Sequence, residues 1–530
     1  MSDFTRGLQE HLSIGSPLVF CETTEDNRLL DYLSTSATEA GSELWVWSPT
    51  TGLRRRVHKG DQWEHEPVQV GDVSIENFEA LVAGLVNLTH AERLPEHLVV
   101  HATDAVSERQ QDSLSEPRNV RLLKDLHGLW EPWAADMKQR QTLVFSGVGW
   151  SIPSALAGYC AALPLPLMSR EELARHPWVA GSSTLERHGV APRNFAERAV
   201  GISDAALSPL MRRLALLEPG SEQVWRLIDH TKEDEVRRTG VLESQRPPTG
   251  VKLGGYGRFR QWFERRCDFF VQPKNDSLRP RGVLLLGFPG CGKSLAAKWI
   301  AQTLRVPLVT MDVGRLQDRW VGASEARMRL ALRTLEATSP CVLFIDEIEK
   351  AIAGTGSESS GVTTRLVGQL LTWLADHREP IFIVATCNRI VDMHNRSNIP
   401  PELTRAGRFD ARFVVPLPEE HERPEILQAV VKQLGLTVNP DVETRLLALV
   451  RSRSAAYSGA ELRQILVEAA YAAGNGCALE PRHVDAVIDT VQPMSCSEEG
   501  KRLKEAYEAM CAAGGAMRAS YTADEQGMLS

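Results

Sequence analysis

Residues 287–294 read Gly-Phe-Pro-Gly-Cys-Gly-Lys-Ser, and this G-x-x-x-x-G-K-[ST] pattern constrains the fold more than any other feature. The apolar run 283–286 before it predicts a buried strand, and residues 295–304 after it predict a helix. Strand, glycine-rich turn and helix form the context in which such a loop binds phosphate. The glycines let backbone N–H groups point at phosphate oxygens, and the helix N-terminus adds partial positive charge. The alternative, a chance glycine-rich turn, is disfavoured by these flanks.

The loop predicts a nucleotide site with a bound Mg²⁺ ion. Lys293 is expected to reach the outer phosphates, and Ser294 to offer its hydroxyl to the metal. The cofactors predicted from this loop are therefore a nucleoside triphosphate and Mg²⁺. Its predicted binding residues are Gly287, Phe288, Pro289, Gly290, Cys291, Gly292, Lys293, Ser294 and Leu295.

Two further apolar runs end in polar side chains suited to phosphoryl chemistry. Residues 341–345 precede Asp346 and Glu347, and Asp346 lies 53 residues after Lys293. At the ligand-binding edge of an open α/β sheet, Asp346 would hold Mg²⁺ and Glu347 would polarise the attacking water. Residues 381–387 precede Asn388, which could hold that water or the γ-phosphate. The alternative for Asn388 is a side chain that caps the next turn.

Composition limits the classes of partner. The net charge of −8 gives no electrostatic argument for nucleic acid or an anionic membrane. Nine scattered Cys without a C-x-x-C pair argue against a disulfide framework and for a reducing compartment. The N-terminus lacks a signal-peptide pattern, and no apolar run approaches the roughly 20 residues of a membrane helix. We therefore expect a soluble cytoplasmic protein.

The pattern along the chain predicts an α/β fold with five parts. Strands at 17–22, 43–48, 97–102 and 142–146 alternate with helices, which favours a mostly parallel sheet. A linker rich in Pro and Gly lies at 245–255, and a polar, mobile end follows Gly514. The chain could hold two copies of one plan, a larger α/β part followed by a smaller helical part. The predicted parts are 1–165 α/β, 166–240 helical, 241–420 nucleotide-binding, 421–495 helical and 496–530 tail.

Together these motifs resemble the AAA ATPases (ATPases associated with diverse activities) over roughly 251–490. The segment 401–410 carries Arg405 and Arg408, which could otherwise be surface ion-pair residues. The resemblance implies that Arg405 is an arginine finger acting on a neighbouring subunit's ATP, with Arg408 as its companion. It also implies that Gly459 and Ala460 begin a lid helix near the nucleotide, and that Gly255 lies in a segment touching the adenine. The fold implied is a P-loop NTPase module with a helical lid.

A narrower resemblance covers the whole chain. Segments 163–173 and 232–270 resemble a plastid and bacterial AAA group in which a degenerate AAA-like N-terminal module precedes one active module. Where that first module would need a phosphate loop, the chain reads Thr23-Thr-Glu-Asp-Asn27 without Gly or Lys. Glu25 and Asp26 would repel phosphate, so this module is expected not to bind ATP.

The resemblance also implies a ring, most often a hexamer, with loops lining a central pore. Trp320 and Val321 resemble the pore loop that grips a protein substrate, although Trp320 could instead be a core residue. ATP-driven protein remodelling is therefore predicted. The alternative is a nucleotide-switched scaffold or regulator that binds a partner through its N-terminal domain. One departure from the family is the 17-residue interval from Asn388 to Arg405, which predicts an extended loop near 391–398.

Overall fold

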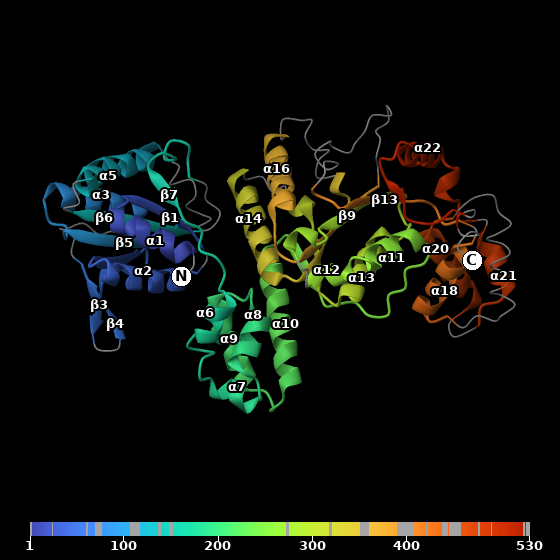
Figure 1. Cartoon of the computed structure of the whole chain (residues 1–530), viewed down its shortest axis with the longest axis horizontal. Coiled ribbons are helices and arrows are strands. Elements are labelled where there is room, and N and C mark those ends of the chain that lie inside the picture. Colours follow the sequence, from blue (N-terminus) through green and yellow to red (C-terminus); the bar gives the residue numbers. More distant parts are fainter. Residues whose placement is uncertain are drawn as a thin grey trace. The chain divides into compact units, whose positions relative to one another are not determined.

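The computed structural model divides the chain into two compact units, Met1–Glu235 with Asp318–Leu330, and Val236–Gln317 with Ala331–Ser530 (Figure 1). We describe each unit by itself. The structure describes residues 3–23, 25–59, 62–68, 77–106, 117–135, 139–147, 152–271, 275–316, 321–349, 360–388, 407–419, 421–436, 444, 457–474, 478–488, 490–522 and 525.

The first unit begins with a seven-stranded sheet of order β4-β3-β2-β5-β6-β1-β7. All neighbours pair in parallel except those of the antiparallel β2, β3 and β4 meander. The strands predicted from the sequence are confirmed as β1, β2, β5 and β6. The elements are α1 (Asp3–Ile14), β1 (Leu18–Glu22), α2 (Asp26–Glu39), β2 (Glu43–Ser48), β3 (Gly52–Lys59), β4 (Gln62–Pro67), α3 (Phe78–His90), β5 (His97–Val106), α5 (Pro117–Ala135), β6 (Arg140–Gly147) and β7 (Cys160–Ala162).

Helices cover both faces of this sheet, as buried parallel strands require. Leu8 of α1 and Leu33 of α2 share one core with Val144, whereas Phe78 of α3 and Trp130 of α5 share the other with the opposite side of the strands. A helical part with its own core follows (Figure 1). Its elements are α6 (Arg170–Arg175), α7 (Ser183–Arg187), α8 (Pro192–Ala199), α9 (Asp204–Ala215) and α10 (Ser221–Arg238).

The second unit contains another seven-stranded sheet, of order β14-β13-β9-β12-β11-β10-β8. Only β8 runs antiparallel to its neighbour. The elements of this part are β8 (Leu242–Gln245), α11 (Gly257–Glu264), α12 (Cys267–Val271), η1 (Asp276–Leu278), β9 (Gly282–Gly287), α13 (Lys293–Leu304), β10 (Leu308–Met311), η2 (Val313–Leu316), α14 (Val321–Thr338), β11 (Cys341–Ile345), α16 (Ser360–Asp376), β12 (Ile381–Cys387), β13 (Ala411–Val415) and β14 (Met517–Arg518).

The direction of each crossover sets which face a helix covers. The step from β9 to β10 moves one way across the sheet, and the steps through β11 to β12 move back. Because such crossovers are right-handed, α13 covers one face, and α16 and the end of α14 from Ala331 onward cover the other. On the α13 face, Phe259 and Phe263 of α11 pack edge-on against Phe413 and Phe382 of the strands.

A helical part also follows the second sheet. It consists of α18 (Arg423–Leu434), α20 (Gly459–Ala473) and α21 (Pro481–Ile488), which share one core, followed by η4 (Met494–Cys496) and α22 (Glu498–Ala512). The chain then returns as β14, whose residues Met517 and Arg518 pair with β13. The expectation of a mobile end after Gly514 is wrong up to Thr522, because strand pairing and the buried Ala519 fix this segment on the sheet.

The two sheets share one strand order. Leaving aside β3, β4, β8 and β14, the first reads β2-β5-β6-β1-β7 and the second β10-β11-β12-β9-β13. In order of appearance along the chain, both read second, third, fourth, first, fifth. This agreement supports the interpretation of the chain as two copies of one plan, and both sheets are parallel α/β sheets as predicted. Among the described residues, we find no helix with the length and hydropathy needed to cross a bilayer.

Candidate active site

The glycine-rich turn between β9 and α13 is shaped by contacts that exclude a side chain. Gly290 has a φ of +75° and Gly292 one of +88°, which are left-handed values that glycine adopts without strain. A Cβ atom on Gly290 would lie 2.7 Å from Cβ of Ala460, so the turn and the start of α20 can approach only because Gly290 has no side chain. The N–H of Ala460 donates to the Gly290 carbonyl at 3.0 Å. The predicted Gly459 and Ala460 thus lie against the turn.

Lys293 lies within this turn with only 6% of its surface exposed. Its ammonium donates to the carbonyls of Gly287 and Phe288 at 2.8 and 2.7 Å, across the loop that precedes it. Burial lowers the pKa of Lys293, although the nearby Cys291 and Asp346 act in the opposite direction. A cation is therefore held at the N-terminus of α13, where an anion would also meet the helix dipole.

The two predicted carboxylates follow β11 at the same edge of the sheet. Thr386 of the neighbouring β12 donates its hydroxyl to Asp346 at 2.5 Å and accepts the N–H of Glu347 at 2.9 Å. Glu347 has a φ of +49°, an uncommon backbone conformation for a residue with a side chain. Sequence reasoning missed Thr386, whose signal was a single hydroxyl inside the apolar run 381–387.

Asn388, directly after β12, lies next to Glu347. Its side-chain amide donates to Oε1 of Glu347 at 2.8 Å, and its backbone N–H donates to Oε1 of Glu349 at 2.8 Å. Glu349 was also missed from the sequence. Among the described residues, the other oxygen of the buried Glu349 has no hydrogen-bond partner. The amide and the Glu347 carboxylate can therefore face one small molecule together.

The residues before β9 close the turn from another side. The phenol of Tyr256 is buried and donates to the carbonyl of Cys291 at 2.9 Å. The neighbouring Gly255 donates its N–H to Glu425 of α18 at 3.3 Å. Gly255 therefore lies beside both the glycine-rich turn and the helical part of this unit, and its contact with adenine stays a prediction.

The donor atoms present fit a nucleotide with Mg²⁺. The glycine cradle and the buried Lys293 suit phosphate, as argued above. Ser294 and Asp346 are exposed and supply oxygen atoms, the ligands that a hard divalent cation prefers. Lys293, Asp346, Glu347 and Asn388 converge because β9, β12 and β11 are neighbours and end at the same edge.

Several predicted residues lie apart from this cluster or outside the described part of the chain. Trp320, Arg405 and the interval 391–398 lie outside the described residues. Val321 is the first residue of α14. Arg408 is partly buried in the turn before β13. The roles predicted for these residues stay predictions.

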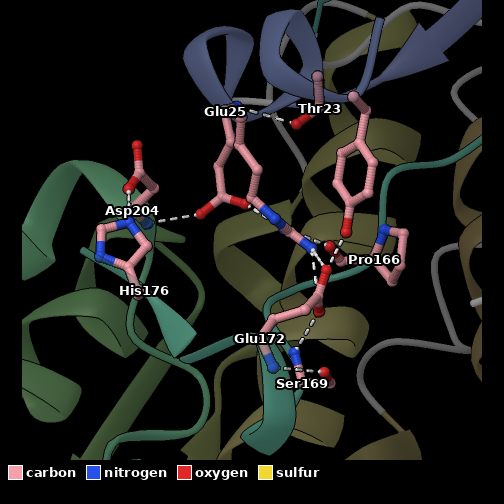
Figure 2. Close-up of polar contacts among 9 residues, drawn as sticks. Thr23, Glu25, Pro166, Ser169, Glu172, His176 and Asp204 are labelled. Atoms are coloured by element: carbon pink, nitrogen blue, oxygen red, sulfur yellow. Dashed lines mark hydrogen bonds and ion pairs between the residues drawn. The ribbon is translucent and has the colours of Figure 1, made fainter. Parts of the chain in front are cut away.

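The corresponding turn of the first unit carries a network of charged side chains instead (Figure 2). Oε2 of Glu25 pairs with Arg28 at 2.6 Å, and Oε1 accepts the N–H of Asp204 at the start of α9 at 2.7 Å. Arg28 also donates to the Pro166 carbonyl at 2.6 Å and pairs with Glu172 at 3.3 Å. Both Glu25 and Arg28 are buried. An internal carboxylate thus meets the N-terminus of α9.

Comparison with known proteins agrees with this architecture. Residues 283–417 match the family "ATPase family associated with various cellular activities (AAA)", and residues 4–165 match "SpoVK-like AAA ATPase, N-terminal domain". The chain is 32% identical to the AAA domain-containing protein ycf46 of Guillardia theta, over 67% of this chain and 71% of that protein. It is also 32% identical to ycf46 of Trieres chinensis, over 63% and 67%.

A shorter match is to the peroxisomal ATPase PEX1 of Saccharomyces cerevisiae, with 32% identity over 46% of this chain and 23% of that protein. The ycf46 relatives extend over more of this chain than PEX1 does, and they match the plastid and bacterial group named from the sequence. The shared strand order, the glycine-rich turn and these relatives agree, and the chain belongs to the AAA ATPase family, with a SpoVK-like N-terminal domain before its AAA domain.

Proposed function

We propose that the chain hydrolyses ATP with Mg²⁺ as a ring-forming ATPase and uses the energy to remodel protein substrates. The observation that carries this proposal is the convergence of Lys293, Asp346, Glu347 and Asn388 at the ends of three neighbouring strands. The similarity to PEX1, a peroxisomal ATPase, agrees with ATP hydrolysis. Mg²⁺ would be held by Ser294 and Asp346 and would neutralise charge on the phosphates.

Different residues of the chain then bind the nucleotide and promote its hydrolysis. Lys293 binds the outer phosphates, and the backbone N–H groups of the turn hold the others. Glu347 orients the attacking water and takes its proton, while the Asn388 amide 2.8 Å away fixes the direction of that carboxylate. Arg405, with Arg408 beside it, would stabilise charge on the γ-phosphate of the neighbouring subunit.

Hydrolysis is tested by measuring phosphate release from Mg-ATP with the parent chain and with Glu347→Gln. We expect the variant to bind ATP with the parent's affinity and to lose turnover, because an amide cannot take the proton. Glu379→Gln, at an exposed carboxylate before β12, is the matched control and should keep full turnover. Turnover by Glu347→Gln at the parent's rate would disprove the role of Glu347.

The trans arrangement is tested by mixing two inactive variants, Arg405→Ala and Lys293→Ala. Mixed rings contain some interfaces with an intact loop and an intact finger, so we expect partial recovery of turnover. The trans role is wrong if the two variants co-assemble, a single intact site is able to turn over, and the mixture still shows no turnover.

Remodelling rests on the Trp320–Val321 motif. We expect Trp320→Ala to keep basal turnover and to lose its stimulation by unfolded protein. Glu347→Gln should capture such protein in the presence of ATP. Partner binding that differs between ATP and ADP and is indifferent to Trp320→Ala would instead support the nucleotide-switched scaffold.

A further inference from the structure

The helix α22, which lies far from the phosphate loop in the sequence, places Tyr507 at the ends of β9 and β12. Tyr507 is 3% exposed, and its hydroxyl donates to the main-chain carbonyl of Asn388 at 2.7 Å. Its ring meets Phe288 of the glycine-rich turn edge-on, with 5.4 Å between the ring centroids. One side chain therefore contacts both the turn that precedes Lys293 and the residue that faces Glu347.

With this contact, three atoms of Asn388 have fixed partners. Its N–H is held by Glu349, its carbonyl by Tyr507, and its side-chain amide reaches Glu347. The first two bonds hold the main chain on both sides of the Cα atom, so they determine where the amide points. Burial raises the pKa of Tyr507, and the nearby Cys387 and Glu349 raise it further, so the phenol keeps its proton and remains a donor.

The chain is held in place both before and after α22, the helix that carries Tyr507. Before α22, the N–H of Met494 donates at 2.7 Å to Glu461, which also closes the capping box of α20. After it, β14 pairs with β13, and the Ala519 N–H donates to the Val414 carbonyl at 2.8 Å. The position of Tyr507 is therefore set by the helical part and by the sheet together.

We propose that Tyr507 is a positioning residue for ATP hydrolysis, which fixes the main chain of Asn388 so that its amide meets the Glu347 carboxylate. The proposal rests on the ATPase function proposed above. Tyr507 acts through Asn388, so its loss should slow the chemical step and leave ATP binding by the glycine-rich turn intact.

The test is Tyr507→Phe, which keeps the ring against Phe288 and removes only the hydroxyl. Loss of one buried hydrogen bond that positions a reacting group should lower kcat about tenfold, with the dissociation constant for ATP unchanged within about twofold. Tyr521→Phe is the matched control, because its hydroxyl bonds the exposed Gln261 away from the site at 2.9 Å and its removal should leave kcat unchanged.

A second measurement separates positioning from a general effect on stability. In an Asn388→Ala background the amide is already lost, so Tyr507→Phe should lower the residual kcat by less than about twofold. Equal losses in both backgrounds, or a parent-like kcat for Tyr507→Phe, would overturn the proposal while leaving the ATPase function intact. A parent chain that does not hydrolyse ATP would overturn both.

Discussion

Residues 22–26 and 287–293 occupy the same place in two sheets of the same strand order, between the first parallel strand of each and the helix that follows it. In the second unit, glycines with positive φ curl the backbone around the buried cation of Lys293. In the first unit the glycines are absent, and Glu25 presents a buried carboxylate. The comparison shows how one topology can either receive an external anion or supply its own.

The consequence for the first unit is a link between its two parts that requires no nucleotide. Glu25 accepts the N–H at the start of α9, the role that a phosphate plays at other helix N-termini. Arg28 continues the link to Glu172 of α6, which also accepts the hydroxyl of Tyr32 (Figure 2). A phosphate placed here would meet a carboxylate that is already paired.

The largest effect should come from removing the cation of the second unit. Lys293→Ala deletes the charge that faces the outer phosphates, so we expect ATP affinity to fall by at least about a hundredfold. Calorimetry should give one ATP per parent chain and none for the variant at the same concentration. If the parent chain binds two ATP molecules and Lys293→Ala still binds one, the first unit also binds nucleotide. The proposed difference between the two units would then be wrong.

Removing the carboxylate of the first unit should cost stability and leave ATP binding unchanged. Glu25→Gln leaves Arg28 buried with one charged partner fewer, and breaking a buried ion pair costs about 3 kcal/mol. Hydrogen exchange in the full chain should show faster opening of β1 and α9, with the AAA domain unaffected. Glu10→Gln, at an exposed carboxylate of α1, should change nothing. Unchanged exchange for Glu25→Gln would contradict the link.

The sequence predicted the features of this contrast that depend on residues close together in the chain. It did not predict pairs of residues that lie far apart in the sequence. The strand ends carrying Lys293, Asp346, Glu347 and Asn388 were predicted, because each motif follows its own apolar run. The missing phosphate loop at Thr23–Asn27 was predicted for the same reason. Arg28 and Glu172, 144 positions apart, were not paired, because nothing local to either residue indicates the other.

The same reason explains what was missed in the second unit. Tyr507 and Asn388 are 119 positions apart, and the sequence placed Tyr507 only in the tail at 496–530. The pairing of β14 with β13 was hidden as well, because two residues give no strand periodicity. Only the folded sheet brings these segments together.

The next comparison concerns a second buried carboxylate, Glu422, which lies beside Gly255 in the second unit. Burial raises the pKa of Glu422 to about 7. The hydrogen bond from the Glu419 N–H lowers this pKa only in part, and the negative charge of the Glu419 carboxylate raises it further. The pKa of Glu422 is higher in the folded chain than the unfolded value of 4.5. The stability that this carboxyl group contributes is therefore fully present below pH 4.5, and it is lost as the pH rises to about 7.

Glu422→Gln should therefore remove a decline in stability of about 3 kcal/mol between pH 4.5 and pH 8. Denaturant unfolding of the full chain at several pH values measures this change in the transition of the second unit. The variant should be more stable than the parent at pH 8. Glu468→Gln, at an exposed carboxylate of α20, should keep the parent's pH dependence. Parallel curves for parent and Glu422→Gln would show that Glu422 ionises normally.

The smallest effect compares two capping boxes of the same design, Ser169 with Glu172 in the first unit and Ser458 with Glu461 in the second. Each Ser→Ala change removes one helix cap and should cost about 1 kcal/mol. Only Ser458 begins a helix whose Ala460 N–H bonds the Gly290 carbonyl. We therefore expect Ser458→Ala to raise KM for ATP a few-fold and Ser169→Ala to leave it unchanged, in the same phosphate-release assay. Equal KM values for both variants would mean that the start of α20 contacts the turn without influencing ATP, and the helical parts of the two units would then differ less than their turns do.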